Sequence, residues 1–327
     1  MESYLVGRQL SVQIGNCNSA ELTNSSGVPQ GSNLGPLLFS IFFNDAAHVR
    51  LFFANDLKIF LVIRRLEDCR ELQNLLNMFY DWCMKNRLML SIDKCLVISY
   101  HRTQNVVLYD YDIAGTKLTR VNQVKDLGVI LDEKLSFKPH LSSTIDNTSR
   151  QLGFIFKIAR EFDDPLCFKA LYCSLVRSKL EFASVIWNPY QASWIDRLES
   201  IQRKFVRYAL RHLPWNDPQN LPPYEDRCRL LGIKTLAQRR RATQAVFIAK
   251  LITAEADAPE LLSQIQFYAP SRVLRSRTML QIEHQSTQYA AHGPVSSMAR
   301  QFNQYSDLFD FNIPSSVFRR RILESDM

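Results

Sequence analysis

The sequence predicts an α+β fold, with strands concentrated in the first part of the chain and helices in the second. Up to about residue 131, short β-prone runs alternate with turn signals. One long segment within this part, 66–88, has apolar residues at spacings of three and four, which indicates a helix. From about residue 141 the helical spacing dominates.

The composition is that of an ordinary globular protein. The chain has 327 residues, of which 46% are hydrophobic and 22% charged, enough for about two domains. No apolar run approaches the roughly 20 residues that span a bilayer, and the first residues lack the basic start and apolar core of a signal peptide. The seven cysteines include no CxxC pair, which favours a reducing compartment. We therefore expect a protein of the nucleus or cytoplasm that is neither secreted nor bound to a membrane.

The positive charge is concentrated in the middle of the chain. Residues 151–250 hold 17 Lys and Arg against 9 Asp and Glu, whereas residues 1–150 hold 16 against 15 and residues 251–327 hold 7 against 8. An excess of this kind suits a polyanionic partner, with nucleic acid as the first candidate. The alternative is a solvated helical surface with no such partner.

The first 50 residues contain turn signals around one predicted helix. Residues 10–14 alternate apolar and polar side chains, which predicts a short strand, and 16–26 is predicted to be a loop. The run 27–32 has a proline between two glycines and predicts a turn. It leads into an apolar helix at 37–44, with Pro36 in its first turn, where a missing N–H costs nothing.

A hairpin and a long amphipathic helix are predicted next. The β-prone runs 51–53 and 57–63 flank Ala54-Asn55-Asp56 and indicate a hairpin. The helix at 66–88 carries acidic residues near its start, which complement the helix dipole. Further strands are predicted at 96–100 and within 105–131, with Gly115 in a turn.

The second half is predicted to be helical at 141–162, 165–180, 191–213 and 235–253. In 191–213 the apolar stripe consists of Trp194, Leu198, Ile201, Phe205 and Tyr208. The basic residues on the other faces are Arg197, Arg203, Lys204, Arg207 and Arg211. Prolines between 214 and 223 mark a break. The chain beyond 265 is predicted to be irregular, with one helix near 296–305.

Several possible sites are excluded by spacing. The six histidines show no metal-ligand spacing, so no zinc site is predicted. The cysteines are interpreted as small buried hydrophobes, and Trp82 and Trp194 as packing residues rather than platforms for bases. No phosphate loop of the GK[ST] type is present.

Two motifs together carry a family resemblance. The first is Gly27-Val28-Pro29-Gln30-Gly31-Ser32, followed by Leu34-Gly35-Pro36-Leu37-Leu38-Phe39 and Asn44-Asp45. The second is Phe53-Ala54-Asn55-Asp56-Leu57-Lys58. In this order they resemble the polymerase region of reverse transcriptases from non-LTR retrotransposons, of the LINE-type, jockey-like kind. Later segments extend the resemblance over nearly the whole chain, notably 127–132 and 198–205.

The resemblance implies an RNA-directed DNA polymerase fold and a set of site residues. Residues 1–100 would be part of a polymerase palm, 101–180 a thumb-like connection and 181–327 a helical C-terminal region. The family's partners are an RNA template and a DNA primer, and its catalytic metal is Mg²⁺. The catalytic pair would be Asn55 and Asp56. The nucleotide- and template-binding residues would be Gly27, Val28, Pro29, Gln30, Gly31, Ser32, Phe53 and Ala54.

The chain departs from the family at the positions that hold metal. Two-metal nucleotidyl transfer needs carboxylates that bridge both ions, and the first aspartate of the hairpin is here Asn55. The 26 residues before Gly27 contain only Glu2 and Glu21 as acids, so the family's upstream catalytic aspartate has no counterpart among them. We therefore expect an N-terminally truncated, catalytically inactive relative, with Asp56 vestigial, no functional metal site and no cofactor of its own.

Two alternative functions remain open. The chain could be a non-specific RNA- or DNA-binding remnant that contacts the nucleic-acid backbone through Arg203, Lys204, Arg207 and Arg211. It could also be an active polymerase if the gene model is incomplete. For the glycine-rich run, the alternative is a plain turn capped by Ser32 or Asn33. For the basic helix, the alternative is pairing of its arginines with Asp196 and Glu199. The sequence does not determine the oligomeric state.

Overall fold

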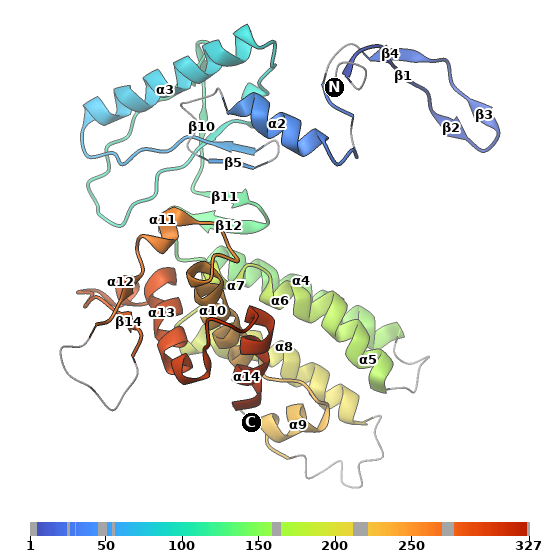
Figure 1. Ribbon diagram of the computed structural model, residues 1–327, viewed down its shortest axis with the longest axis vertical. Coiled ribbons are helices and arrows are strands. Elements are labelled where there is room, and N and C mark those ends of the chain that lie inside the picture. Colours follow the sequence, from blue (N-terminus) through green and yellow to red (C-terminus); the bar gives the residue numbers. More distant parts are fainter. Residues whose placement is uncertain are drawn as a thin grey trace. The chain divides into compact units, whose positions relative to one another are not determined.

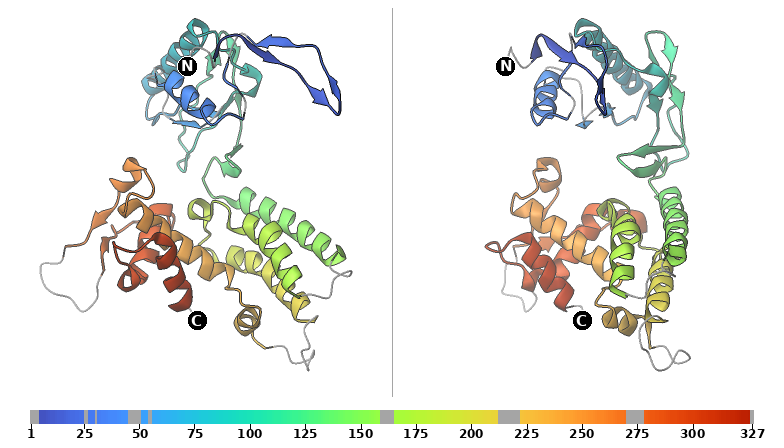
Figure 2. Two further views of the ribbon diagram at one scale, coloured as in Figure 1. Left: turned by 45° about the vertical axis from the view of Figure 1, so that its right-hand side comes forward. Right: turned by 90° about the vertical axis from the view of Figure 1, so that its right-hand side faces the viewer.

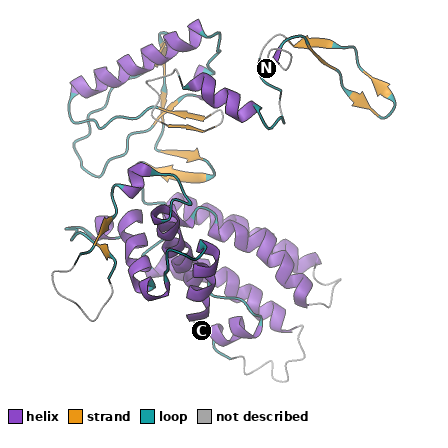
Figure 3. Ribbon diagram, in the orientation of Figure 1, coloured by secondary structure: helices purple, strands orange, loops and turns teal. Residues whose placement is uncertain are grey.

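The computed structural model describes residues 5–24, 27–29, 31–44, 51–53, 56–158, 165–211, 222–269 and 278–325. The chain divides into two compact units, Met1–Asn122 and Gln123–Met327 (Figures 1 and 2). Helices and small, mostly antiparallel sheets occur together, which confirms the α+β class (Figure 3). The three-part division at residues 100 and 180 remains a prediction.

The first unit begins with a long two-stranded arm (Figure 2). Strand β1 (Arg8–Leu10) pairs antiparallel with β4 (Leu22–Asn24), and β2 (Gln13–Ile14) pairs with β3 (Cys17–Asn18). The predicted loop at 16–26 is therefore wrong for β3 and β4. The predicted strand at 10–14 is confirmed only in part, because Leu10 ends β1 whereas Gln13 and Ile14 form β2. The arm is exposed along its length, so the apolar alternation at 10–14 does not correspond to a buried face.

The predicted helix after the glycine-rich run is confirmed as α2 (Gly35–Phe43), which has proline in its first turn. Its last two rings pack against α3 (Leu66–Lys85): Phe42 and Phe43 lie 5.4 and 5.2 Å from the Trp82 ring, centroid to centroid. Trp82 also stacks on Phe79 at 6.1 Å, so this tryptophan is a packing residue, as predicted.

The predicted hairpin is confirmed; its first strand has the predicted bounds, whereas the second, predicted at 57–63, is shorter and begins one residue earlier. Strand β5 (Leu51–Phe53) pairs antiparallel with β6 (Asp56–Lys58), and Phe53 lies opposite Asp56. The predicted helix at 66–88 is confirmed as α3, which ends at Lys85. At its start, the Asp68 carboxylate accepts hydrogen bonds from the backbone N–H groups of Arg64 and Arg65, which lowers the pKa of Asp68.

The remaining strands of the first unit are short. Strand β7 (Leu96–Val97) is parallel to β10 (Thr119–Arg120), and β8 (Asp112–Ile113) pairs with β9 (Thr116–Lys117). A 3₁₀ turn precedes β7 at Ile92–Lys94. Helix α3 is fixed to β8 by Gln73, whose amide exchanges two hydrogen bonds with the backbone of Asp112, at 2.8 and 3.1 Å. The described hydrophobic core of this unit is small: Cys69, Phe79, Cys83, Tyr111 and Ile113.

The cysteine prediction is correct only in part. Cys69, Cys83 and Cys228 are buried, and burial raises the pKa of the Cys83 thiol to about 11. Cys17 is exposed, because it lies on the arm, where no other element covers it. The other three, Cys95, Cys167 and Cys173, are half-buried.

The second unit starts with a hairpin and continues as helices. The hairpin consists of β11 (Gln123–Asp126) and β12 (Val129–Asp132). The helices up to the proline-rich break are α4 (Lys138–Ile158), α5 (Pro165–Leu171), a π-helical stretch (Tyr172–Arg177), α6 (Ser178–Glu181), α7 (Ser184–Trp187) and α8 (Ala192–Arg211).

After the break the chain forms α9 (Tyr224–Leu230), α10 (Leu236–Ile252), α11 (Pro259–Leu262), β13 (Gln266–Phe267), β14 (Leu280–Gln281), α12 (Gln288–Ala291), α13 (Pro294–Gln304), a 3₁₀ turn (Ser306–Leu308) and α14 (Ser315–Ser325). The four long helices predicted from periodicity correspond to α4, to the α5–α6 stretch, to α8 and to α10.

Two hydrophobic clusters hold the second unit together. The first joins α4, α5 to α9 and the β11–β12 hairpin; within it the Tyr172 ring stacks on Phe205, with centroids 4.0 Å apart. The second joins α10, α13 and α14 around Phe302 and Phe318. Helix α10 contributes to both, with Leu236 in the first cluster and Ile248 in the second.

The prediction of one helix after residue 265 is wrong, because α14 also forms there. Phe318 and Ile322 are four residues apart and fully buried against α10 and α13. Between them lie Arg319, Arg320 and Arg321. This charge run interrupts the apolar pattern, so the short buried face of α14 is hard to recognise from the sequence.

The β11–β12 turn depends on a glycine. Leu127 and Gly128 both have positive φ, at 44° and 89°, which matches the twist that two-residue hairpin turns need. A Cβ atom on Gly128 would lie 2.9 Å from the Phe182 ring. Any side chain at this position would therefore force Phe182 to move.

A buried histidine predicts that the second unit is sensitive to pH. His140 is 6% exposed, its ring lies 5.4 Å from the Trp187 ring, and its Nδ1 accepts the Ile130 N–H at 3.3 Å. Burial lowers the pKa of His140 below its ordinary value of 6.5. Protonation is therefore less favourable in the folded than in the unfolded chain, and the unfolded chain binds more protons below pH 6.5.

We expect the free energy of unfolding to fall as the pH drops through 6.5 toward the lowered pKa, by about 1.4 kcal/mol for each unit by which the pKa is lowered. Urea unfolding at pH 7.5 and 5.5 measures this loss. In His140→Gln, which keeps an acceptor but does not titrate, the loss should be smaller. An equal loss in the variant would assign the effect to other groups.

Candidate functional site

The glycine-rich run folds onto the start of α2. Gly27 and Gly31 adopt φ of 75° and 83°, values that side chains disfavour. Among the described residues, no heavy atom beyond the chain neighbours lies within 4 Å of the Cβ position of either glycine. The backbone is therefore accessible at both glycines. Arg8 donates to the Gly27 carbonyl at 2.7 Å, and the Ser32 hydroxyl accepts the Gly35 N–H at 2.9 Å. Ser32 thus satisfies the first N–H of α2, but the N-cap position itself is Leu34, so the alternative of a cap by Ser32 is confirmed only in part.

Five of the eight predicted nucleotide-binding residues are described in this run. Val28 and Pro29 are half-buried, because they lie close to Gly35: a Cβ there would be 3.3 Å from the Pro29 carbonyl and 3.5 Å from Val28. Gln30 lies outside the described residues. In this loop the two glycines are exposed, whereas Val28 and Pro29 are half-buried.

Of the predicted catalytic pair, the structure describes Asp56, in the β5–β6 hairpin. Since Phe53 lies opposite Asp56, the connection between β5 and β6 is two residues long, Ala54 and Asn55. These two residues and the Phe53 side chain lie outside the described part of the chain. Asp56 is the first residue of β6 and is exposed. Helix α2 connects the glycine-rich run to the segment that leads into this hairpin.

The basic helix α8 has one buried and one charged face. The predicted stripe is confirmed: Leu198, Ile201 and Phe205 are fully buried, and Trp194 and Tyr208 are half-buried. Lys204 and Arg207 are exposed, and within the described residues neither has an ion-pair partner. The charged face is therefore available to a ligand at these two positions.

Arg203 differs from its neighbours. Its Nη1 lies 2.6 Å from the Asp196 carboxylate, and its guanidinium lies 5.4 Å from the centroid of the Tyr224 ring. Arg203 is therefore already engaged, as the solvated-surface alternative predicted for Asp196. The side chain of Arg211 lies outside the described part of the chain.

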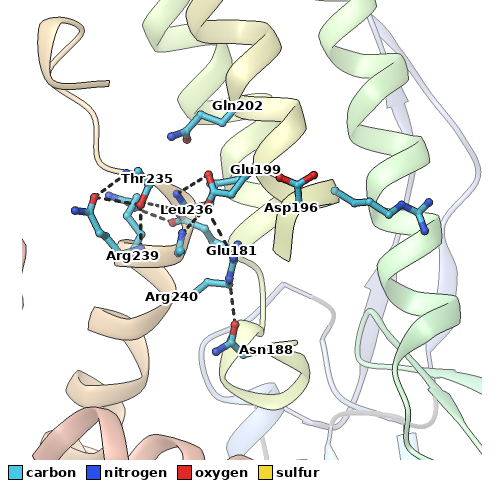
Figure 4. A network of polar contacts seen from close by, with 12 residues as sticks. Glu181, Asn188, Asp196, Glu199, Gln202, Thr235, Leu236, Arg239 and Arg240 are labelled. Carbon is cyan, nitrogen blue, oxygen red and sulfur yellow. Dashed lines mark hydrogen bonds and ion pairs between the residues drawn. The ribbon is translucent and has the colours of Figure 1, made fainter. Parts of the chain in front are cut away.

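Glu199 does not pair with the exposed arginines of α8. It is 5% exposed and points into the unit, toward the N-terminus of α10 (Figure 4). Its carboxylate accepts hydrogen bonds from the Tyr224 hydroxyl and the Ala237 N–H, both at 2.6 Å. It thereby satisfies a free N–H of the first turn of α10, where negative charge is favoured.

Arg240 is the charge partner of this carboxylate. It is 2% exposed, and its Nη2 lies 3.9 Å from Glu199 Oε1. Its Nε donates to Asn188 at 3.1 Å, and no hydrogen-bond partner for its Nη1 is found among the described residues. Burial lowers the pKa of Arg240, and the Glu199 charge opposes this effect. The buried pair of Glu199 and Arg240 thus connects α8 with α10, and the hydrogen bond to Asn188 connects α10 with the residue that follows α7.

Sequence reasoning missed this network. A glutamate and an arginine in amphipathic helices are most often on the surface, and nothing in their spacing predicts a contact across 41 residues. The only sequence signal is that Glu199 is next to Leu198 and close to Ile201, on the apolar stripe.

The described residues contain no group of three His, Cys, Asp or Glu side chains that could hold a metal ion. They also contain no helix that is long and apolar enough to cross a membrane.

Comparison with known proteins first finds a similarity to one class of protein. Residues 1–131 match the family described as "Reverse transcriptase (RNA-dependent DNA polymerase)". This match includes the glycine-rich run, α2 and the β5–β6 hairpin. No solved structure matches the chain.

The particular relatives are named as proteins of transposons and mobile elements. The chain is 27% identical over 234 residues to the "Probable RNA-directed DNA polymerase from transposon BS" of Drosophila melanogaster. It is 29% identical over 233 residues to the "RNA-directed DNA polymerase from mobile element jockey" of Drosophila funebris. Each alignment covers 66% of this chain and 25% of the relative. The chain therefore spans about a quarter of these relatives, and its predicted relationship to jockey-like, non-LTR retrotransposon reverse transcriptases is confirmed.

Proposed function

We propose that this chain is a reverse-transcriptase derivative that binds nucleic acid but does not polymerise it. Under this proposal residues 1–100 correspond to part of a palm, 101–180 to a thumb-like connection and 181–327 to the helical region that follows. The order of the glycine-rich run, α2 and the β5–β6 hairpin supports the assignment of the palm. Gly27 to Ser32, Phe53 and Ala54 would then be ancestral contacts to nucleotide and template.

Asn55 is the observation that supports the loss of polymerisation. Two Mg²⁺ ions at a hairpin tip repel each other unless carboxylates neutralise them. An amide oxygen can ligate a metal but carries no charge, so Asn55 and Asp56 together supply one negative charge where the family has two. The residues present do not fit a two-metal centre, and no step of nucleotidyl transfer is assigned to them.

The 327-residue polypeptide is therefore expected to give no primer extension above a buffer blank with primer–template, dNTPs and Mg²⁺ or Mn²⁺. Asn55→Asp alone is not expected to restore extension, because no acid near the glycine-rich run matches the second metal-bridging position of the family. A retroviral reverse transcriptase on the same primer–template is the positive control. Metal-dependent elongation by the unchanged polypeptide would overturn the proposal and favour an active polymerase.

The exposed cations of α8 support the binding half of the proposal. Lys204 and Arg207 are exposed on a helix whose opposite face is buried in the first hydrophobic cluster. Packing of that face fixes the positions of their backbone. Exposed cations of this kind bind the phosphate backbone of RNA or DNA without recognising its sequence. The family's template and primer are the partners that this chemistry fits.

A further inference from the structure

A small polar cavity lies in the helical unit between the β13–β14 hairpin and the start of α13 (Figure 1). Its volume of about 270 Å³ is below the roughly 300–1,000 Å³ of pockets for drug-sized ligands, so it suits a single small ring. Most of its exposed wall is polar, and among the described residues it is lined by one acid and no Lys or Arg. The polar side chains of the lining are Gln264, Gln266, Gln281, Glu283, Gln285 and Ser296. The cavity therefore fits a ligand with both hydrogen-bond donors and acceptors, and not a phosphate group.

The edge of β14 that faces α13 already binds one carboxamide. Tyr268 donates to the Met279 carbonyl at 2.8 Å, so the alternation of an antiparallel pair directs the backbone groups of Leu280 away from β13. The Asn303 side chain of α13 occupies both groups: it accepts from the Leu280 N–H at 2.9 Å and donates to the Leu280 carbonyl at 2.8 Å. A planar group with a donor beside an acceptor therefore fits this edge.

The next position along the same edge is unoccupied. Ile282 follows Leu280 by two residues and lines the cavity, and by the same alternation its N–H and carbonyl face the side that Leu280 presents to Asn303. Among the described residues no hydrogen-bond partner is found for either group. The cavity thus contains a backbone donor and acceptor, side by side, that the described part of the chain does not satisfy.

This edge is too short to receive an added peptide strand. Strand β14 has two residues, and Asn303 occupies the backbone of one of them. An extended peptide binds a sheet edge through several successive backbone groups, which this edge does not offer. A single planar group is the ligand that fits.

Two further observations favour a nucleobase as that group. Phe267 and Tyr268 directly follow the lining residue Gln266 and are 53% and 40% exposed. Proteins bind unpaired bases by stacking them on exposed aromatic rings and by hydrogen bonds to their edges. Residues 270–277, which lie outside the described part of the chain and are not counted in the site, contain three arginines and no acid. The sequence between the two strands therefore carries positive charge, which favours a nucleic acid over an uncharged ligand.

We infer that this cavity binds an unpaired nucleobase and prefers bases that carry an exocyclic amino group. The N–H and carbonyl of Ile282 match the acceptor and donor that lie side by side on the edges of cytosine and adenine. Glu283 is placed to accept from the amino group, as carboxylates do from cytosine N4. Uracil has an oxygen at that position, which a carboxylate repels. The base can belong to a free nucleoside or to a single strand. The inference goes beyond the proposed function, which depends on phosphate contacts of α8.

The test is fluorescence anisotropy of the full chain with two labelled 12-nucleotide single strands, oligocytidylate and oligouridylate, at the same salt concentration. The two strands have the same backbone charge, so phosphate contacts cancel in the ratio of their Kd values. Oligocytidylate is expected to bind at least about fivefold more tightly, which is the discrimination given by one well-placed base contact. Equal Kd values would overturn the inference.

Cytidine and uridine, tested with the full chain by saturation-transfer NMR, separate this cavity from α8, because nucleosides carry no phosphate. Transfer to cytidine and little to uridine supports the inference even where α8 binds no nucleic acid, and shows that the base alone is sufficient. A preference seen only with the strands assigns the base to a nucleic acid. Transfer to N-acetylglutaminamide, with no preference between the two strands, would assign the cavity to a peptide carboxamide and overturn the inference.

Two variants and one control make the result specific. Glu283→Gln, which removes the carboxylate, and Ala299→Leu, which fills the cavity, should each reduce the preference for oligocytidylate to below about twofold. Glu260→Gln is the matched control, because Glu260 is an exposed acid of the same unit that does not line the cavity. It changes the net charge as Glu283→Gln does, and the preference should persist. A preference that also persists in Glu283→Gln and Ala299→Leu would place base recognition elsewhere and overturn the inference.

Discussion

Replacing Glu199 by Gln is expected to lower the free energy of unfolding of the helical unit by about 3–5 kcal/mol. The substitution keeps the size of the side chain but leaves the Arg240 guanidinium, 2% exposed, without its counter-charge. It also weakens the hydrogen bonds to the Tyr224 hydroxyl and to the first turn of α10. Urea unfolding followed by the helical circular dichroism signal measures the loss.

Asp196→Asn is the matched control for this prediction. Asp196 is on the same helix and also pairs with an arginine, but the Asp196–Arg203 pair is exposed, so its loss should cost less than about 1 kcal/mol. The ranking of the two variants, rather than either value alone, tests whether the buried network matters. Equal losses in Glu199→Gln and Asp196→Asn would contradict the structure at this site.

The double variant Lys204→Gln, Arg207→Gln is expected to weaken nucleic-acid binding and its salt dependence together. Each backbone phosphate contacted by a cation adds about 0.9 to the slope of log K against log salt on duplex DNA. Losing two such contacts should therefore reduce the slope by about 1.8. Fluorescence anisotropy with unrelated RNA and DNA duplexes, from low to physiological salt, measures both quantities.

The variant Arg203→Gln distinguishes the two interpretations of α8, a surface that contacts phosphates and a solvated surface whose arginines pair with acids. Because Arg203 is paired with Asp196, it has less charge to offer a phosphate, so its loss should change the slope by less than half as much as the double variant does. Both variants should keep the helical signal of the unchanged chain, since none of these side chains lies in the apolar stripe. An unchanged slope in the double variant would leave α8 as an ordinary solvated surface.

The elements with strong periodicity could be predicted, because the spacing of their apolar residues itself shows which face is buried. In α8 the spacing of Leu198, Ile201 and Phe205 alone identifies the buried face. The β5–β6 hairpin was predictable for a similar reason, since both strands are β-prone and flank a turn signal. The arm formed by β1 to β4 was predictable only in part: the alternation at 10–14 indicated a strand, whereas β3 and β4 are mostly exposed and have no buried face that would impose alternation.

Features that depend on distant partners could not be predicted. Glu199 is buried because the N-terminus of α10 meets it, and that contact joins residues 38 positions apart. The cavity between the β13–β14 hairpin and α13 depends on how a helix meets strands that precede it in the chain. Gln264, Gln266 and Gln281 were visible in the sequence, but glutamine is mostly exposed in proteins, so their presence indicates no site.

The position of the candidate site along the chain was predictable, whereas its atomic arrangement was not. The motifs identified the glycine-rich run and the hairpin, and the comparisons find a similarity to the family to which these motifs point. The contact of Ser32 with the first N–H of α2 and the contact of Arg8 with Gly27 depend on how the loop folds onto α2. Gln30, Ala54 and Asn55 lie outside the described residues, so their roles remain predictions.

The central claim is that the chain binds nucleic acid and does not extend it. The most direct test is to incubate the 327-residue polypeptide with a labelled primer–template, dNTPs and Mg²⁺ at low salt. One half of the sample is then run on a native gel and the other on a denaturing gel. We expect the native gel to show primer–template in complex and the denaturing gel to show a primer of unchanged length. A lengthened primer, or primer–template that stays entirely unbound at low salt, would contradict the claim.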